Sequence, residues 1–561
     1  MPVEISSDTP IDIDKSFKIK AGPGTGKTYW IVEHIKNVSK NSTRLFSTKK
    51  ILCITYTNIA AETIMTRLGS STTQVEVLTI HSFLYKHIIK PYMVFISEEY
   101  NFDISNLDGH DDKIVSDYSF LQEWKARTGQ QRIQDDHLIT YAFSKIRWKL
   151  QDDELIPRTE FPIKYKSYPI KNDSYQVYKE MAWSRGVLHH DDVLYFSFQI
   201  LKKFPFVIKV LNQKFPYIFV DEFQDSNPIQ VDIIKRLSGG STIGVIGDIA
   251  QSIYLFQGAS PQLFEDFTLP EMGEYYLTFN RRSSNEIIDF LNEIRSDLTQ
   301  NYYRNVSVSK PTLFVGDMVE ALKRAKSECS DQYVYTLSRN NITSNAMKSE
   351  INGTGMDDKL LKKIIEIDSN PKRANLLTAC ISAVALAKQS KFKDAIKTLE
   401  NHINNRRDRL SGRKKALNYL TTLMQKYEDY RHLTMLEFSE FVRSDINENM
   451  PKATKGKGKV FYESHSFHDV SLCVNISEDI SYHRTIHKSK GDEFENVLLI
   501  LTEQADLKFI YEPDLYNYKT EEHRIYYVGA SRARNNLFLT VPELDAETEA
   551  IISSTVNIHH L

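Results

Sequence analysis

Residues 17–38 read FKIKAGPGTGKTYWIVEHIKNV, and this stretch decides the fold. FKIK is typical of a β-strand, AGPGTGKT of a glycine-rich turn, and the following residues of a helix. Glycines allow backbone N–H groups to converge on phosphate oxygens at a helix N-terminus, so the stretch predicts a phosphate-binding loop. In this pattern Lys27 reaches the terminal phosphates and the Thr28 hydroxyl holds Mg²⁺, while Ala21 stands where a glycine is usual.

A second stretch, YIFVDEFQDS at residues 217–226, supplies the acidic partner that such a loop requires. An apolar strand ends here and delivers Asp221 and Glu222 at its carboxyl end. Asp221 can bind Mg²⁺ through water, and Glu222 can orient and deprotonate an attacking water, because phosphoryl transfer mainly needs positioning and charge neutralisation. The two stretches together predict a nucleoside triphosphatase.

Length and composition are those of a multidomain globular protein. The 561 residues exceed what one hydrophobic core supports, with 41% hydrophobic and 26% charged residues. The net charge of -2 neither favours nor excludes nucleic acid. The four cysteines are far apart, and the sequence shows neither a signal peptide nor a membrane span, so we expect a soluble, cytoplasmic protein.

Further blocks, together with the first two, resemble in the same order the motifs of the UvrD, Rep and PcrA helicases of superfamily 1. These blocks are ITYTNIAAETIMTRL from Ile54, LTIHSF from Leu78, GDIAQSIYLFQGA from Gly247, LTFNRRSS from Leu277, LSRNN from Leu337, TIHKSKGDEFENV from Thr485 and EHRIYYVGASRAR from Glu522. The order and length of these blocks make the resemblance far more specific than a phosphate loop alone.

The resemblance implies an α/β fold with two RecA-like P-loop NTPase domains, parallel sheets and ATP between the domains. The alternation of β-type runs with helical stretches fits this architecture. We expect each domain to carry a mostly helical insertion. The expected division is residues 1–88 and 189–268 for the first domain with insertion 89–188, and residues 269–340 and 479–561 for the second domain with a reduced insertion 341–478.

The resemblance also assigns the residues of an ATP site. It implies that Gln251 contacts the γ-phosphate and that Arg282 and Arg532 approach it from the second domain, although the adjacent Arg281 is an alternative to Arg282. The catalytic set is Asp221, Glu222, Gln251, Arg282 and Arg532, with Mg²⁺ on Thr28 and Asp221. The ATP-binding set is Ala21, Gly22, Pro23, Gly24, Thr25, Gly26, Lys27, Thr28, Tyr29, Arg281 and Glu493.

A second set of residues falls where the family contacts single-stranded DNA. Aromatic side chains in this set can stack on any base, which suits stepping along a strand. The set is Tyr56, Thr57, Asn58, His81, Tyr254, Phe256, Arg339 and His487.

Several positions depart from the family pattern. Tyr29 stands where an arginine is usual, and Arg281 replaces a tyrosine that stacks on adenine. The family's adenine-reading glutamine is missing upstream of the phosphate loop, since the first glutamine is Gln74. Acceptance of GTP or dATP therefore stays open. Phe256 and Gln257 replace the tryptophan and arginine of W-R-G-A, which alters the DNA-contacting surface.

Three functions remain open on the sequence. The first is an ATP-dependent single-stranded DNA translocase or helicase of 3′-to-5′ polarity, acting in DNA repair or replication restart. The second is a DNA-sensing ATPase subunit that regulates an associated nuclease in antiviral defence, because the trimmed insertions resemble the helicase-like subunit of the Gabija antiphage system. The third is a nucleotide-binding scaffold without hydrolysis, which the full set of catalytic residues disfavours.

Overall fold

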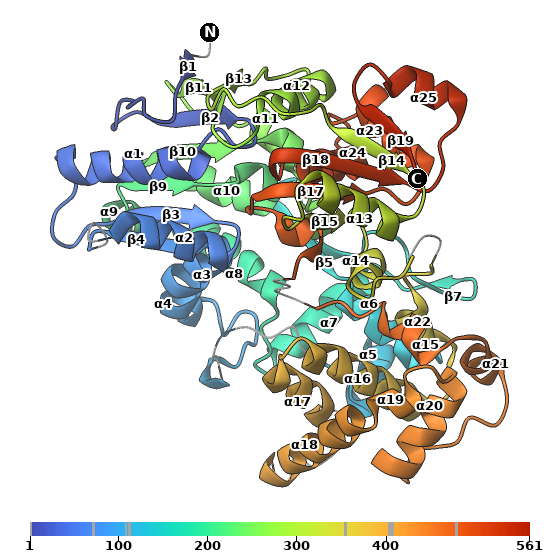
Figure 1. Cartoon of the computed structure of the whole chain (residues 1–561). Helices are drawn as coiled ribbons and strands as arrows, with labels where there is room; N and C mark the ends of the chain where they lie inside the picture. The colour runs from blue at the N-terminus through green and yellow to red at the C-terminus, as the bar shows by residue number, and fades with distance from the viewer. Residues whose placement is uncertain are drawn as a thin grey trace. The chain divides into compact units, whose positions relative to one another are not determined.

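The computed structural model describes residues 3–69, 73–106, 109, 114–352, 356–401, 409–476 and 481–561 (Figure 1). The chain divides into two compact units. Unit 1 contains the chain up to Arg281 with segments 297–303 and 515–521. Unit 2 contains residues 282–296, 304–514 and 522–561.

Unit 1 is built on a seven-stranded parallel sheet. Its strands, in spatial order, are β1 (Val3–Ile5), β11 (Gly273–Leu277), β2 (Phe17–Ala21), β10 (Thr242–Gly247), β9 (Tyr217–Val220), β3 (Ile51–Thr55) and β4 (Val75–Thr79). Because successive side chains of a strand point to opposite faces, Ile51 and Cys53 join one core, and Leu52 and Ile54 the other. Burial on both faces explains why these strands are almost wholly apolar.

Helices cover both faces of this sheet. They are α1 (Lys27–Asn41), α2 (Asn58–Leu68), α3 (Ile80–Leu84), α4 (Lys90–Tyr92), α8 (His190–Lys203), α9 (Pro205–Lys214), α10 (Pro228–Leu237) and α11 (Pro261–Glu265). A π-helical turn, Tyr85–Ile89, links α3 to α4. Between α4 and α8 the chain leaves the sheet and forms the first insertion.

The first insertion contains two β-hairpins as well as helices. Its elements are α5 (Tyr118–Thr128), α6 (Asp136–Ser144), β5 (Arg147–Gln151), β6 (Glu154–Arg158), β7 (Lys164–Tyr165), β8 (Tyr168–Pro169) and α7 (Asp173–Trp183). The helices enclose a core of their own around Trp124, Phe143 and Tyr178. The insertion is therefore mostly helical, as expected, but the hairpins were not predicted.

A buried carboxylate joins the insertion to the core of unit 1. Asp192, in the first turn of α8, accepts hydrogen bonds from Lys179 Nζ at 2.8 Å, Trp148 Nε1 at 2.9 Å and Trp183 Nε1 at 3.0 Å. Burial alone would raise the pKa of Asp192, but Lys179 and His189 outweigh it and hold that pKa well below its usual value. The carboxylate is therefore ionised and satisfied by donors from β5, from α7 and from His189, the residue before α8.

The first unit extends further along the chain than the sequence predicted. We expected the second domain to begin at residue 269, but β11 pairs in parallel with β1 and β2 and so completes the first sheet. Segments 297–303 and 515–521 also belong to unit 1. Strand pairing and side-chain packing decide which unit these separate segments join, and a sequence motif does not show such contacts. The other expected boundary of the second insertion, at residue 478, falls outside the described residues.

Unit 2 is built on a six-stranded parallel sheet. Its strands, in spatial order, are β16 (His483–Thr485), β15 (Tyr335–Ser338), β17 (Phe494–Ile500), β18 (Ala533–Val541), β14 (Thr312–Val315) and β19 (Asn557–His560). The helices beside it are α12 (Asn285–Ile294), α13 (Met318–Glu328), α14 (Asn341–Lys348), α23 (Lys508–Tyr511), α24 (Glu522–Ala530) and α25 (Ala546–Ile552).

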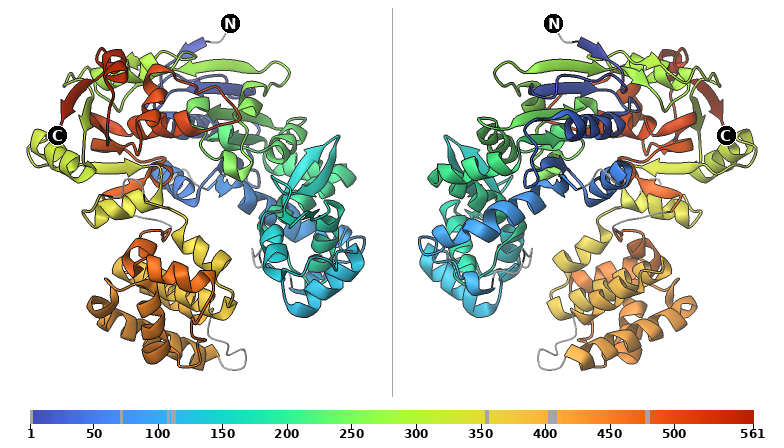
Figure 2. Two further views of the ribbon diagram at one scale, coloured as in Figure 1. Left: turned by 90° about the vertical axis from the view of Figure 1, so that its right-hand side faces the viewer. Right: turned by 90° about the vertical axis from the view of Figure 1, so that its left-hand side faces the viewer.

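The second insertion is a helical bundle, drawn in yellow to orange in Figure 2. Its helices are α15 (Leu360–Ile367), α16 (Pro371–Lys388), α17 (Phe392–Glu400), α18 (Arg409–Gln425), α19 (Tyr427–Tyr430), α20 (Met435–Phe441), α21 (Lys457–Ser464) and α22 (Phe467–Ser471). A buried ion pair between Arg373 and Asp368 lies within it, and Tyr462 donates to the same carboxylate at 2.6 Å. The predicted fold class, two parallel α/β sheets with inserted helices, is confirmed.

Among the described residues, none of the helices has the length and apolar character needed to cross a membrane.

We predict that Asp192→Ala strongly destabilises unit 1. The substitution leaves the buried Lys179 ammonium unpaired and removes the acceptor of two indole N–H groups, so we expect a loss of about 3 to 5 kcal/mol in the free energy of unfolding. Urea unfolding followed by tryptophan fluorescence measures this, because Trp148 and Trp183 contact the carboxylate directly. The control Glu160→Ala, at an exposed position of the same insertion, should unfold like the unchanged protein.

Candidate functional site

The predicted site residues of unit 1 leave the carboxyl ends of neighbouring parallel strands. β2 leads into the phosphate loop, β10 into Asp248 and Gln251, and β9 into Asp221 and Glu222. These three strands are adjacent in the sheet, so their carboxyl ends lie at one edge. Ligands of open α/β sheets bind outside this edge, which makes it the candidate site.

The phosphate loop turns sharply into α1. Gly24 and Gly26 have φ angles of 72° and 84°, in the left-handed region where a side chain would be strained. The buried Thr25 hydroxyl donates to the Gly22 carbonyl at 2.9 Å and closes the loop. α1 then begins at Lys27 without a capping side chain, so its first N–H groups remain available for a phosphate. Lys27 and Thr28 are half-buried in its first turn, and Tyr29 is exposed.

The two acidic residues after β9 have different environments. Asp221 is 5% exposed, and its backbone N–H donates to the Ile54 carbonyl at 2.9 Å. Glu222 has a φ angle of 52°, a left-handed conformation that costs a non-glycine residue about 1 to 2 kcal/mol. Such strain is concentrated at functional sites, where the fold holds a side chain in one direction.

The residues fit a magnesium ion that is shared with a nucleotide. Mg²⁺ prefers oxygen ligands and usually takes one or two carboxylates together with water and substrate phosphates. Asp221 and Thr28 offer such oxygens, whereas the described residues contain no group of three or more His, Cys, Asp or Glu that could hold a metal alone. The ion would neutralise charge on the phosphates, and the chain would contribute Thr28 and Asp221 to its coordination.

Gln224 was not among the predicted residues, yet it joins the segments after β9 and β10. Its fully buried side chain donates to Glu222 Oε2 at 2.5 Å and accepts from the Asp248 backbone N–H at 3.0 Å. The backbone carbonyl of Gln224 accepts a hydrogen bond from the Ser252 hydroxyl at 3.1 Å. The glutamine is visible in VDEFQDS, but its bonding partners are not, because they follow a different strand.

Gln251 lies in the same network. Its amide donates to Asp248 Oδ2 at 2.6 Å, and the side chain is 3% exposed. The short helical segment η6 (Ile249–Gln251) that carries it begins directly after Asp248, whose carboxylate caps it by accepting from the Ala250 N–H at 3.2 Å. Hydrogen bonds thus connect Gln251 to Glu222 through Asp248 and Gln224.

Arg281 lies over the phosphate loop within unit 1. Its backbone N–H donates to the Gly24 carbonyl at 2.8 Å, and its guanidinium pairs with Asp8. The guanidinium also stacks on Tyr303, at 4.0 Å from the ring centroid. The loop is held further by Gln300, whose amide donates to the Pro23 carbonyl at 2.7 Å. Neither Asp8 nor Gln300 was predicted, since neither belongs to a motif.

Three predicted nucleotide residues lie together in unit 2. Arg282 pairs with Glu493 at 3.0 Å and donates to the Ser531 carbonyl at 2.9 Å. Arg532, 2% exposed, donates to the Val528 carbonyl at 3.0 Å and to the Ser531 hydroxyl at 2.8 Å. Burial alone would raise the pKa of Glu493, but Arg282 and the other nearby arginines outweigh it and hold that pKa below its usual value. The cluster is thus arginine-rich, with one ionised carboxylate.

Aromatic residues of the predicted DNA set cluster in unit 1. Tyr56, after β3, stacks on Tyr254 with ring centroids 4.6 Å apart, and Tyr254 lies 6.0 Å from Phe256. Tyr56 also donates a hydrogen bond to Gln257. Phe256 is 61% exposed, which is unusual for a large apolar side chain. The three rings form a track, and its exposed end suits stacking on a base.

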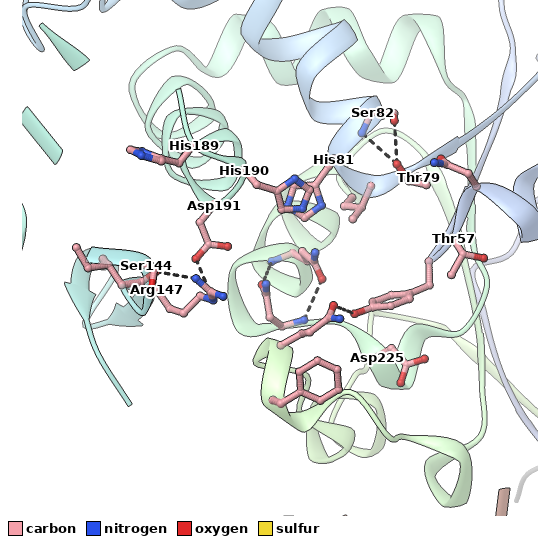
Figure 3. Close-up of a pocket in the computed structure, with 18 of the residues that line it drawn as sticks. Thr57, Thr79, His81, Ser82, Ser144, Arg147, His189, His190, Asp191 and Asp225 are labelled. Atoms are coloured by element: carbon pink, nitrogen blue, oxygen red, sulfur yellow. Dashed lines mark hydrogen bonds and ion pairs between the residues drawn. The ribbon is translucent and has the colours of Figure 1, made fainter. Parts of the chain in front are cut away.

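The track borders a cavity of about 860 Å³ (Figure 3). Its lining includes five predicted DNA residues, which are Tyr56, Thr57, Asn58, His81 and Phe256. The cavity brings together side chains that follow β3, β4 and β10. Arg339 and His487 belong to unit 2, where Arg339 forms a bidentate pair with Glu522 at 2.9 and 2.8 Å.

Two models of one protein family together match most of the chain. The model of the UvrD/REP helicase N-terminal domain matches residues 7–270, and that of the UvrD-like helicase C-terminal domain matches residues 272–543. The chain belongs to the UvrD/REP helicase family. The relatives named PcrA and Rep are ATP-dependent DNA helicases, so this is a family of ATP-hydrolysing enzymes.

Three relatives illustrate the extent of the similarity. Gabija protein GajB of Bacillus cereus is 28% identical over 51% of this chain and 48% of its own length. A probable DNA helicase II homolog of Mycoplasma genitalium is 24% identical over 93% of this chain and 82% of its own. ATP-dependent DNA helicase PcrA of Bacillus subtilis is 25% identical over 94% of this chain and 81% of its own length. The matched part thus spans about half of GajB and about four-fifths of the other two.

We predict that Gln224→Ala lowers the kcat for ATP hydrolysis roughly 10- to 100-fold with little change in KM, because Glu222 loses the donor that orients its carboxylate. Steady-state kinetics measures both constants. Gln262→Ala, at an exposed position on α11, is the matched control and should leave both constants unchanged. A change in KM alone, with kcat preserved, would contradict an orienting role for Gln224.

Proposed function

We propose that the chain is an ATP-dependent translocase or helicase that moves along single-stranded DNA in the 3′-to-5′ direction. ATP bound at the phosphate loop is hydrolysed with Glu222 as the base that activates water and Asp221 and Thr28 as magnesium ligands. Gln251 senses the γ-phosphate, and Arg282 and Arg532 stabilise charge on it during transfer. The family resemblance supports the proposed polarity.

One observation carries this proposal: a single segment of unit 1 holds both a nucleotide residue and two DNA residues. η6 carries Gln251, and η7 (Leu255–Gln257) and the residue before it carry Phe256 and Tyr254. Ser252, between them, is bonded to Gln224, which in turn contacts Glu222. A shift of this segment during hydrolysis would therefore move the aromatic track, which is what stepping requires.

The experiment that tests this proposal is ATP hydrolysis with and without single-stranded DNA, together with unwinding of a 3′-tailed duplex. We expect DNA to stimulate hydrolysis and the duplex to open only when the tail is 3′. Lys27→Ala should abolish turnover because the phosphate-binding ammonium is lost, whereas Glu222→Gln should bind ATP without turning it over. Appreciable turnover in either variant would contradict the assigned roles, and opening of a 5′-tailed duplex would contradict the polarity.

A second candidate function is supported by the similarity to Gabija protein GajB. In this alternative the chain is a DNA-sensing ATPase subunit that controls an associated nuclease in antiviral defence. DNA-stimulated hydrolysis without unwinding by the chain alone would favour it. Purification of the chain from its native host together with a stoichiometric nuclease would then identify the partner.

We predict that Tyr254→Ala raises the DNA concentration needed for half-maximal ATPase stimulation about tenfold, because the stack that supports Tyr56 and the track is lost. A titration of oligothymidylate against the ATPase rate measures this. Tyr118→Ala, which removes a 73% exposed ring from the first insertion, serves as the control. An unchanged half-maximal concentration in Tyr254→Ala would exclude the track from DNA binding.

A further inference from the structure

The cavity beside the aromatic track has a second wall, which the first insertion and the adjoining start of α8 provide. Ser144 at the end of α6, Arg147 at the start of β5 and His190 at the start of α8 all line it (Figure 3). His190 stacks on His81 of the opposite wall with ring centroids 3.7 Å apart. The insertion therefore contributes Ser144 and Arg147 to the cavity, and the start of α8 faces the residues that follow β4.

The charged residues that line the cavity differ greatly in exposure. The side chain of Arg147 is 54% exposed, whereas that of Lys179 is 4% exposed and its ammonium is bound to Asp192. Asp191 is 22% exposed, and Asp225 is 3% exposed. The lining contains one arginine, Arg147, and one lysine, Lys179. Of these two side chains, that of Arg147 is the one that is exposed to solvent.

The position of Arg147 is set by the buried side of its own strand. β5 alternates, so that Trp148 points inward and donates to Asp192, and Arg147 points the other way. Asp191 lies beside the guanidinium at 3.9 Å, a distance at the limit of an ion pair. One guanidinium N–H donates to the Ile146 carbonyl at 2.9 Å. A guanidinium has five N–H donors, so most of its fork is available for another acceptor.

The two walls therefore differ in chemistry. The wall formed by the sheet edge presents rings and small polar groups that are bonded to one another, such as Thr79 with Ser82 and Asn227 with Gln230. Rings suit the faces of bases. The insertion wall presents an exposed guanidinium, and this group matches a phosphate oxygen. A strand with its bases toward the track would turn its phosphates toward the insertion.

We propose that Arg147 of the first insertion binds a backbone phosphate of the single-stranded DNA held in this cavity. The proposal rests on the proposed function, since it names a further contact of the same site. A local cation is needed here because the whole chain has a net charge of -2 and the cavity also contains two aspartates. Without Arg147 the exposed charge left among the lining carboxylates would be that of Asp191, 22% exposed, which repels a polyanion.

The test is the salt dependence of DNA binding, measured by fluorescence anisotropy with labelled oligothymidylate about 20 nucleotides long. The full chain is compared with Arg147→Ala, Arg147→Lys and Arg158→Ala between about 50 and 200 mM salt. Arg158 is the matched control because it lies directly opposite Arg147 in the register of the β5–β6 hairpin but does not line the cavity. The thermal unfolding midpoint of each variant shows whether the fold is retained.

We expect Arg147→Ala to weaken binding about tenfold and to reduce the slope of log Kd against log salt by about 0.7, the contribution of one phosphate on a single strand. Arg147→Lys should restore the slope, because the charge returns, and Arg158→Ala should match the unchanged protein. Wild-type affinity and slope in Arg147→Ala would overturn the proposal while leaving the proposed function intact. Absence of DNA binding by the unchanged chain would instead overturn the proposed function.

An equal loss in Arg147→Ala and Arg158→Ala would also overturn the assignment, since it would show a general effect of charge on the hairpin. A loss of affinity with an unchanged salt slope would do the same, because a phosphate contact must release a counterion.

Discussion

The parallel pairing of β2, β10 and β9 is the constraint on which the rest of the site depends. Parallel strands place their carboxyl ends at one edge, so three segments that are distant in the sequence leave the sheet side by side. The phosphate loop, the acidic pair and the Asp248–Gln251 segment could not otherwise meet. Burial of the strands on both faces makes this arrangement stable, because a one-residue slip in register would exchange the side chains of two separately packed cores.

From this edge, one short segment extends the nucleotide site toward the DNA residues. Gln224 fixes its beginning through Asp248 and Ser252, and Tyr254 and Phe256 lie at its end. Buried hydrogen bonds of this kind are costly to break, so the segment is expected to move as a whole and not residue by residue. In the proposed function, this segment is the physical route by which a change at the γ-phosphate would reach a base.

The chain passes from one unit to the other within a single motif, between Arg281 and Arg282. Arg281 is tied to the phosphate loop by its backbone, whereas Arg282 is tied to Glu493 and the Ser531 carbonyl. The sequence left open whether Arg281 or Arg282 stabilises charge on the γ-phosphate. Because the two arginines belong to different units, the answer decides which unit supplies that positive charge. The anchoring of Arg281 over the loop by Asp8 and Tyr303 suits a role in holding the nucleotide.

The sequence by itself determined the α/β class, the family and the identity of the motif residues, because phosphate binding needs glycines, a lysine and strand-borne carboxylates at fixed local spacing. It did not reveal the division of the units, since β11 joins the first sheet through hydrogen bonds to β1 and β2. Nor did it reveal Gln224 as a bridge, or Arg147 in the cavity wall. These depend on contacts between segments far apart in the chain, and only tertiary packing decides which of many exposed or polar side chains meet.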